Sequence, residues 1–399
     1  MDIVIIADFC GTFDRKYNNR FLYLAELLSK SNDVEVVTSD FNHDSKMYFN
    51  HTPTERSYKV TMLHEGAYKK NISVKRFISH YIWGRNIRKY LENRKQPDVI
   101  YCAVPTLTAA REAAVFCENN DIKFIIDIQD LWPEAFRMIL NIPVISTIAF
   151  LPFKLAADAV YKRADDIVAV SDTYVERALS INGKCMNGHT VFLGTKLEEF
   201  DNNVTCKPFI EKYDGEIWIG YCGSLSASYD IPNLIHAVRK LQENNVQGIR
   251  LIIMGDGDYK HQFESLAIES CISSVFTGHL PYKQMCATLK QCDIVVNPIK
   301  HGSAASIINK HGDYASAGLP VVNSQENIEY RDLIDTYKMG LNCNNEDAND
   351  MALKIEKFIL DEKLRIEMGK NARRCAEEKF DRKKSYVKIL SIITNEEKE

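Results

Sequence analysis

Short apolar runs alternate with segments of helical periodicity along the whole chain, and this alternation constrains the fold more than any other feature. It predicts parallel sheets covered by helices, because parallel strands need a long crossover between them. In the first half we expect strands at Ile3–Ala7, Val34–Thr38, Val99–Cys102, Phe124–Ile128, Ile167–Val170 and Thr190–Leu193, and helices at Asn19–Lys30 and Leu107–Asn119. In the second half we expect strands at Ile217–Cys222, Arg250–Met254, Ser274–Thr277, Ile294–Pro298 and Pro320–Asn323, and helices at Ile231–Glu243, Tyr282–Lys290 and Asn349–Phe358.

The strand series starts afresh after a polar segment, Glu198–Gly215, which predicts two doubly wound α/β domains. A chain of 399 residues is also too long for one ordinary domain. We place the first domain at residues 1–203 and the second at 204–379. A last helix within residues 380–399 is expected to cross back onto the first domain. Such folds bind ligands at the carboxyl ends of their strands, so we expect the two domains to face a central crevice.

The window Asn297–Glu329 carries the densest chemical signal of the second domain. It reads as a strand, a Gly/Ser loop, a short helix and a second strand. A small-residue loop leading into a helix presents free N–H groups and the positive end of a dipole, which suits a diphosphate. Lys310 and Asp313 are three residues apart and share a helix face. We expect Lys310 to meet phosphate and Asp313 to meet ribose hydroxyls; a surface lysine and a capping acid are the alternatives.

Seven segments in order resemble the landmarks of retaining GT-B glycosyltransferases over nearly the whole chain. They read ADFCGTF, IIDIQDLWPEAF, ADDIVAVSDTYVERAL, IGYCGSLSASYDIPNLIHAVRKL, LIIMGDGD, VFTGHLPYKQM and CDIVVNPI, and the acid of DYASAGLPVV follows them. The second segment is similar to a D-x-x-D-L-W-P-E run of bacterial polysaccharide glycosyltransferases. The resemblance implies a GT-B fold and a nucleotide-diphosphate sugar as donor. It also implies donor-site residues at Gly11, Gly223, Ser303, Ser306, Ile307, Lys310, Asp313 and Glu329.

Two positions depart from the family pattern. Many members carry a second acid eight residues before the one at Asp313, and that position is Ala305 here. The loop after the first strand of the second domain often supplies Arg and Lys to the diphosphate, whereas Ser224–Tyr229 contains neither. Lys310 and the backbone amides of Ser306–Ile308 would then carry more of the phosphate charge. Weaker donor binding, a deoxysugar donor and a non-catalytic protein all stay open.

Two acids, Asp127 and Asp130, lie at the end of the expected strand Phe124–Ile128. Because the carboxyl end of a parallel strand faces the ligand crevice, we predict that both are catalytic. Asp130 would orient or deprotonate the acceptor hydroxyl, next to Trp132 on the acceptor side. The alternative is that Asp130 caps the following turn.

Other polar residues carry weaker predictions. Acids similar to Glu326 and Glu329 border the donor pocket in the family, and a solvated loop is the alternative. His43 and His311 have no evident partner in the sequence, so we expect both at the surface.

The segment Tyr68–Lys95 holds nine Lys and Arg residues against one acid, with Phe77, Tyr81 and Trp83 interleaved. Basic and aromatic residues on an amphipathic stretch suit an anionic membrane surface. A second segment, Met138–Phe153, is apolar but too short to span a bilayer; it would either dip into the interface or pack as core. Together the two segments favour an acceptor sugar carried on a polyprenyl diphosphate.

Composition excludes several classes of function. The formal net charge of −4 argues against nucleic-acid binding. Eleven cysteines without a CxxC pair indicate reduced thiols in a cytoplasmic protein, and the strand-like start MDIVIIADF contradicts a signal peptide. No His, Cys or carboxylate cluster has metal-ligand spacing, so we expect neither a metal nor another cofactor.

These features predict a retaining GT-B glycosyltransferase of the capsule or cell-wall type, similar to rhamnosyltransferases. It would act on a lipid-linked acceptor at the inner face of the plasma membrane. Two alternatives stay open: a sugar-nucleotide 2-epimerase, which shares the architecture, and a catalytically silent subunit that orients a partner transferase.

Overall fold

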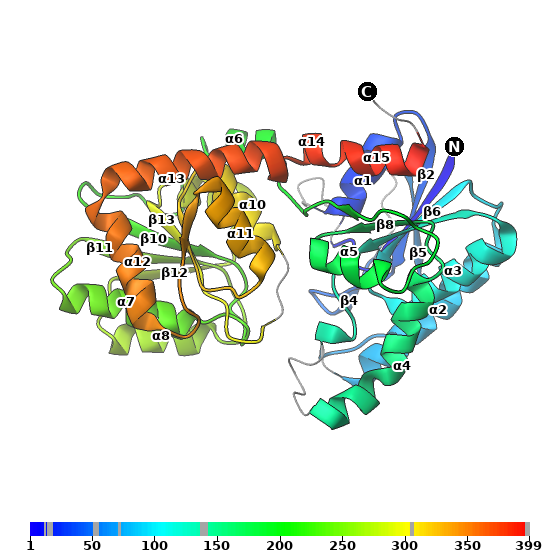
Figure 1. Ribbon diagram of the computed structural model, residues 1–399, viewed down its shortest axis with the longest axis horizontal. Coiled ribbons are helices and arrows are strands. Elements are labelled where there is room, and N and C mark those ends of the chain that lie inside the picture. Colours follow the sequence, from blue (N-terminus) through cyan, green and yellow to red (C-terminus); the bar gives the residue numbers. More distant parts are fainter. Residues whose placement is uncertain are drawn as a thin grey trace. The chain divides into compact units, whose positions relative to one another are not determined.

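The computed structural model describes residues 1–11, 13, 19–50, 56–70, 73–135, 143–303 and 307–395. The chain forms two compact units, Met1–Val191 with Tyr386–Glu399 (unit 1) and Phe192–Ser385 (unit 2), each with its own α/β layers (Figure 1). The boundary expected between residues 203 and 204 falls at the end of helix α6 (Leu197–Asn203), inside unit 2.

Unit 1 is built on a seven-stranded parallel sheet in the order β5-β2-β1-β6-β7-β8-β9. Its strands are β1 (Asp2–Ile6), β2 (Asp33–Ser39), β5 (Lys59–Leu63), β6 (Val99–Val104), β7 (Lys123–Ile128), β8 (Asp166–Ala169) and β9 (His189–Thr190). Its helices are α1 (Arg20–Leu28), α2 (Val74–Asn93), α3 (Leu107–Asn120), α4 (Pro143–Tyr161), α5 (Asp172–Leu179) and α15 (Val387–Thr394). A small antiparallel pair, β3 (Phe41–Asn42) and β4 (Met47–Tyr48), follows β2.

The core of unit 1 joins both ends of the chain. Ile3 and Ile5 of β1 are fully buried, and Ile389 and Ile393 of α15 belong to the same hydrophobic cluster. Burying such side chains contributes about 1.5–3 kcal/mol each. The last helix therefore completes the core of unit 1.

Unit 2 is built on a six-stranded parallel sheet in the order β12-β11-β10-β13-β14-β15. Its strands are β10 (Ile217–Cys222), β11 (Ile249–Met254), β12 (Ser274–Gly278), β13 (Ile294–Asn297), β14 (Val321–Asn323) and β15 (Gly340–Asn342). Besides α6, its helices are α7 (Ile231–Glu243), α8 (Lys260–Glu269), α9 (Tyr282–Lys290), α10 (Asn309–Ser316), α11 (Ile328–Tyr337), α12 (Ala348–Leu360), α13 (Glu362–Cys375) and α14 (Arg382–Ser385), with a π-helical turn, η2 (Ala376–Phe380), after α13.

Strand β10 shows why the sheet of unit 2 is closed on both faces. Trp218 and Cys222 belong to one buried cluster, whereas Ile219 and Tyr221 belong to another. Because side chains alternate along a strand, each face of the sheet packs against its own layer of helices. Polar side chains that bind a ligand can then lie only at the ends of the strands and in the loops that follow them.

The fold-class prediction is confirmed: both units are doubly wound α/β layers with parallel main sheets. Every strand expected from the sequence is present, with ends that differ by at most three residues. The expectation missed β5 and β15, as well as the short pair β3–β4. β15 is only three residues long, and β5 (KVTML) has just two buried-type aliphatic positions flanked by polar residues, so neither gives an apolar run.

Candidate functional sites

Lys310, on helix α10, is the most unusual cation of unit 2. Only 6% of it is exposed, and its Nζ makes no hydrogen bond with any residue that the structure describes. The amine lies 3.9 Å from the centre of the Tyr229 ring and 4.3 Å from that of Tyr221. Two aromatic faces stabilise a cation only partly, because they offer no hydrogen-bond acceptor.

Burial lowers the pKa of Lys310 to about 7, and among the described residues it is Cys222, and not a carboxylate, that counters this effect. An amine in such a place is costly for the fold, since a buried donor without a partner costs about 1–3 kcal/mol. Lys310 is buried, so the alternative of a surface lysine is wrong, whereas its contact with phosphate stays a prediction.

Two neighbours hold the amine in place. Tyr314 of α10 accepts a hydrogen bond from the Cys222 amide (3.0 Å) and donates one to the Val296 carbonyl (3.1 Å), which ties the helix to β10 and β13. Gly223 follows β10 with φ of 144°, and a Cβ there would lie 3.3 Å from Lys310 Nζ. The structure thus brings together two predicted donor residues, Gly223 and Lys310.

Asp313 lies three residues along the same helix but contacts different neighbours. Its Oδ1 accepts hydrogen bonds from Thr195 Oγ1 (3.0 Å) and Tyr282 Oη (2.9 Å). Burial raises the pKa of Asp313 to about 6 in spite of these two donors. Its contact with ribose stays a prediction, and because both bonds end at Oδ1, a ribose hydroxyl would have to reach Oδ2.

The structure describes only part of the predicted phosphate loop. Ser303 is half-buried with its amide bonded to the Lys300 carbonyl, and the Ile307 side chain is 1% exposed in the core. The Ile308 amide, which we expected to meet phosphate, donates instead to Nδ1 of His311 (3.2 Å), because that ring caps the start of α10. Ser306 and Ala305 lie outside the described residues.

The remaining predictions in unit 2 have mixed outcomes. His311 is 1% exposed and stacks on Tyr330 at 3.6 Å between ring centres, so the surface expectation is wrong. Glu326 is exposed and pairs with His301 (2.8 Å), as a solvated loop would. Glu329 is half-buried in the first turn of α11, and its role in the donor site stays a prediction.

In unit 1, Asp127 is fully buried within β7. Its Oδ2 pairs with Arg20 Nε at 2.7 Å and accepts a hydrogen bond from Tyr101 at 2.5 Å. A carboxylate that is closed off in this way offers no surface to a substrate. This burial favours a structural role for Asp127, and its catalytic role stays a prediction.

Asp130 has a different environment just beyond the end of β7. It is half-buried and accepts a hydrogen bond from the Trp132 indole (3.1 Å). Burial raises the pKa of Asp130, with the Trp132 and backbone hydrogen bonds opposing the change. Trp132 in turn stacks on His80 with 5.6 Å between ring centres. The second predicted catalytic acid thus borders a polar cluster that the sequence did not reveal.

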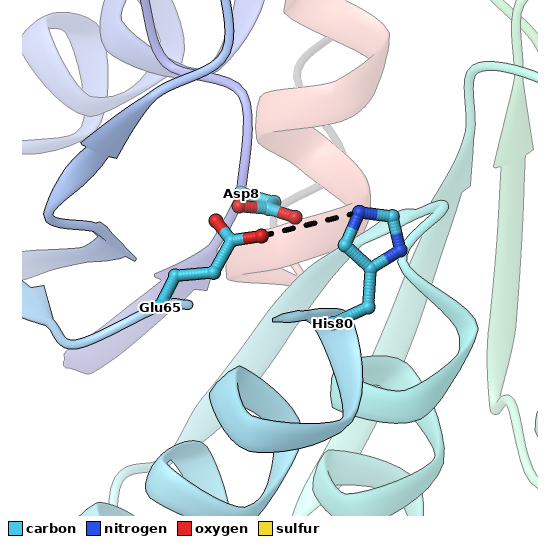
Figure 2. A group of neighbouring side chains, drawn as sticks. All are labelled: Asp8, Glu65 and His80. Atoms are coloured by element: carbon cyan, nitrogen blue, oxygen red, sulfur yellow. Dashed lines mark ion pairs between the residues drawn. The ribbon is translucent and has the colours of Figure 1, made fainter. Parts of the chain in front are cut away.

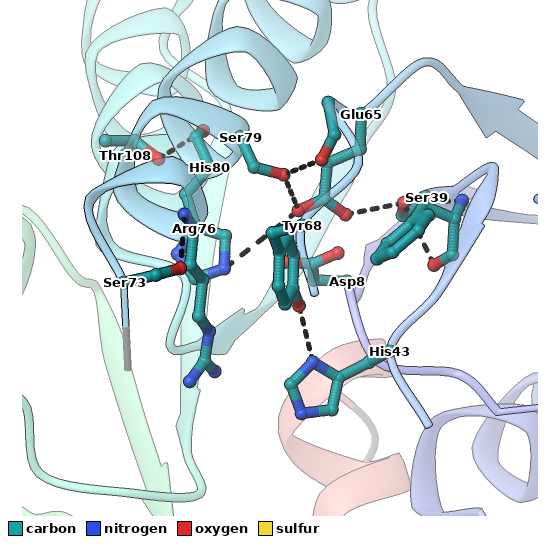
Figure 3. Close-up of polar contacts among 12 residues, drawn as sticks. Asp8, Ser39, His43, Glu65, Tyr68, Ser73, Arg76, Ser79, His80 and Thr108 are labelled. Carbon is teal, nitrogen blue, oxygen red and sulfur yellow. Dashed lines mark hydrogen bonds and ion pairs between the residues drawn. The ribbon is translucent and has the colours of Figure 1, made fainter. Parts of the chain in front are cut away.

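This cluster gathers at the carboxyl ends of β1, β2 and β5, and Figure 3 shows its contacts. Glu65 accepts hydrogen bonds from Ser39 (2.6 Å) and Ser79 (2.5 Å). Asp8 and His80 point toward the same carboxylate (Figure 2). The ligand atoms of Asp8, Glu65 and His80 all lie within 4.8 Å of one another, so these three could hold a metal ion.

A cavity of about 100 Å³ opens beside the cluster. Predicted donor residue Gly11 lines it with a left-handed φ of 72°, which favours glycine. His43 lines it as well; it is half-buried and hydrogen-bonded to Tyr68 (2.5 Å), so it has a partner that the sequence did not reveal. Burial lowers the pKa of His43 to about 4 and keeps the ring neutral.

Sequence reasoning missed this cluster for a physical reason. Asp8, Glu65 and His80 are far apart along the chain, and only the parallel sheet brings them together. The sequence does show that Asp8 and Glu65 each follow a strand, but many surface acids do so as well. A search for metal ligands by their spacing along the chain therefore could not find this group.

None of the helices in the described ranges is both long enough and apolar enough to cross a membrane.

Comparisons with known proteins bear on both units. The family described as glycosyl transferases group 1 matches residues 205–375. An uncharacterized glycosyltransferase of Methanocaldococcus jannaschii, MJ1069, is 25% identical over 248 residues, which cover 61% of this chain. The chain spans about 62% of the length of that relative.

Solved structures resemble the whole chain. Sucrose-phosphate synthase from Thermosynechococcus elongatus has a TM-score of 0.70 at 14% identity, covering 98% of each chain. HepE of Anabaena in complex with UDP and glucose has a TM-score of 0.69 at 14% identity, covering 99% of this chain and 100% of that one. At this identity the likeness shows the fold. The family match itself concerns residues 205–375, which lie within unit 2.

Proposed function

We propose that this protein transfers a sugar from a nucleotide-diphosphate sugar, with retention at the anomeric carbon, to a lipid-linked saccharide acceptor. The observation that carries the proposal is the amine of Lys310. It is buried, is held between two tyrosine rings and Gly223, and makes no hydrogen bond with the described residues.

A diphosphate would supply what this amine lacks. An anion beside Lys310 would restore its charge and accept its hydrogen bonds, which are about twice as strong when both partners are ionised. In sugar transfer the leaving diphosphate gains negative charge, so a fixed cation stabilises the transition state more than the bound donor. The relatives agree with this class of donor, since HepE was solved with UDP and glucose.

Asp130 is our candidate for the acceptor hydroxyl. Burial raises the pKa of Asp130, and its bond to Trp132 fixes its orientation, so the carboxyl is placed to exchange a proton with a bound hydroxyl. Because Asp127 is closed off by Arg20, Asp130 is the one of the two predicted acids that remains available for this role.

The lipid part of the acceptor is supported by an exposed apolar surface on α2 and α4, called here the α2/α4 patch. Phe77 of α2 and Phe153 of α4 are in ring contact at 4.9 Å, so the two helices lie side by side. Exposed apolar side chains continue on both helices: Val74, Ile78, Tyr81, Ile148, Leu151 and Leu155. Exposed basic side chains flank them: Lys75, Arg85, Lys89 and Lys154.

This pattern refines the membrane prediction residue by residue. Trp83 is 1% exposed and Arg76 turns over the Trp132 ring, so neither contributes to the patch. Of the segment Met138–Phe153, residues 138–142 lie outside the described range, and the part within α4 exposes Ile148 and Leu151. An apolar face rimmed by basic residues supports peripheral binding to an anionic membrane.

The test is transfer by the purified chain alone. It is incubated with UDP-, dTDP- and GDP-linked hexoses and deoxyhexoses, rhamnose included, and a polyprenyl-diphosphate saccharide in vesicles. We expect nucleotide release that depends on the acceptor, and a product with the anomeric configuration of the donor by NMR. Conversion of the donor to an isomer would indicate an epimerase, and donor binding without turnover would indicate a silent subunit.

A further inference from the structure

Three ionisable side chains from three separate segments of unit 1 converge inside the protein. Asp8 follows β1, Glu65 follows β5 and His80 lies on α2, and they are 5%, 1% and 3% exposed. Figure 2 shows their polar ends turned toward one another. Such a group needs compensation, because burying like charges together is costly.

Several polar atoms of these three side chains have no hydrogen-bond partner among the described residues. Neither carboxylate oxygen of Asp8 accepts a hydrogen bond from the described residues, and Nε2 of His80 makes none either. His80 Nε2 and Glu65 Oε1 are 4.0 Å apart, which is too long for a hydrogen bond. Two ligands that each lie about 2.0–2.2 Å from one cation can be about that far apart.

We propose that Asp8, Glu65 and His80 bind a divalent transition-metal cation, with open coordination positions toward the adjoining cavity. Two carboxylates and one imidazole suit Mn²⁺ or Zn²⁺. Asp8 lines the cavity of about 100 Å³, which has room for water or a hydroxyl of a bound molecule.

The surroundings of the ligands match a prepared site. The hydroxyls of Ser39 and Ser79 donate to Glu65 and orient its carboxylate, and the Trp132 ring stacks on His80. Such outer contacts typically change metal affinity by about 10–100-fold when removed. The site belongs to unit 1, whereas the proposed phosphate contact is Lys310 of unit 2, so the metal proposal does not depend on the donor site.

The experiment uses Mn²⁺, because the eleven free cysteines would bind softer metals. Full-length protein is stripped with EDTA and titrated with Mn²⁺, and the free ion is followed by EPR without any nucleotide. We expect one Mn²⁺ per chain and a melting temperature that rises with Mn²⁺. Asp8→Asn and His80→Gln should each weaken binding more than about tenfold.

Glu326→Gln is the matched control, since Glu326 also pairs with a histidine but lies exposed in unit 2. It should bind Mn²⁺ like the parent protein. Asp8→Asn removes one of two like charges, so it should melt no lower than the parent in EDTA, and its loss of Mn²⁺ cannot then come from unfolding. A parent protein that binds no Mn²⁺ would overturn the proposal, as would Asp8→Asn with unchanged affinity.

Discussion

The Nζ atom of Lys310 lies 3.9 Å from the centre of the Tyr229 ring, and no described residue gives it a hydrogen-bond acceptor. The buried amine of Lys310 therefore contributes little to the stability of the fold. A negatively charged ligand would pair with this amine, so the amine contributes much more to ligand affinity than to stability.

Lys310→Met should stabilise the protein at pH 7 by about 1–3 kcal/mol, because it removes a buried donor that has no partner. The same change should abolish most of the nucleoside-diphosphate affinity. Lys290→Met is the control: Lys290 is an exposed lysine of the same unit whose amine donates a hydrogen bond to the Ala317 carbonyl (2.6 Å). Its loss should destabilise and leave nucleotide affinity unchanged. Denaturant unfolding and calorimetry measure both effects, and a Lys310→Met protein that is less stable would contradict the account.

Asp313→Asn should change how stability depends on pH. The pKa of Asp313 rises on folding from an ordinary 3.8 to about 6, so the folded state holds the extra proton between these values. That contribution is present below pH 3.8 and is lost as pH rises to 6. The amide does not titrate and still accepts from Thr195 and Tyr282, so the variant should gain stability over the parent above pH 6 but not near pH 4. If the difference in melting temperature between Asp313→Asn and the parent protein is the same at every pH, this prediction is wrong.

Asp130→Asn and Asp127→Asn should give opposite outcomes although they are three residues apart. The Asp130 variant keeps an oxygen for the Trp132 indole, so we expect normal stability and a loss of transfer of about 10²–10⁴-fold. The Asp127 variant leaves Arg20 buried without its charge partner, which typically costs about 3–5 kcal/mol. Specific activity of the folded fraction and the melting temperature separate the two roles. If Asp130→Asn loses stability but not activity, Asp130 is a structural cap.

Binding to anionic vesicles should depend on the α2/α4 patch. Ile78→Ser combined with Leu155→Ser should lower vesicle affinity more than about 100-fold, since each buried apolar side chain contributes about 1.5–3 kcal/mol. The matched control is Ile268→Ser with Leu360→Ser, two exposed aliphatic residues of unit 2. Salt should release the parent protein, because basic residues add about 1 kcal/mol each near an anionic surface. Equal binding of both double variants would exclude the patch.

The sequence predicted the sheets well because buried parallel strands are continuous apolar runs, as β10 and β11 show. The resemblance to a known family named both Lys310 and Gly223 as donor-site residues, and the structure places the two side by side. The sequence could not show that the start of α10 is capped by His311, since that depends on how the ring turns back to the Ile308 amide. Nor could it show that Asp127 is closed off by Arg20, a contact between residues more than 100 positions apart.

The most direct test of the central claim is proton uptake when a nucleoside diphosphate binds. Lys310 alone has a pKa of about 7, and an adjacent diphosphate should raise it toward the ordinary 10.5. Affinity should therefore be greatest at or below pH 7 and should fall as the pH rises, in a range where the phosphate itself is fully ionised.

Calorimetric titration with UDP, dTDP or GDP at pH 8, in two buffers of different ionisation enthalpy, measures this uptake. We predict that the parent protein takes up a proton and that Lys310→Met binds weakly without uptake. Tight binding by the parent protein with the same enthalpy in both buffers would contradict the assignment of the diphosphate to Lys310.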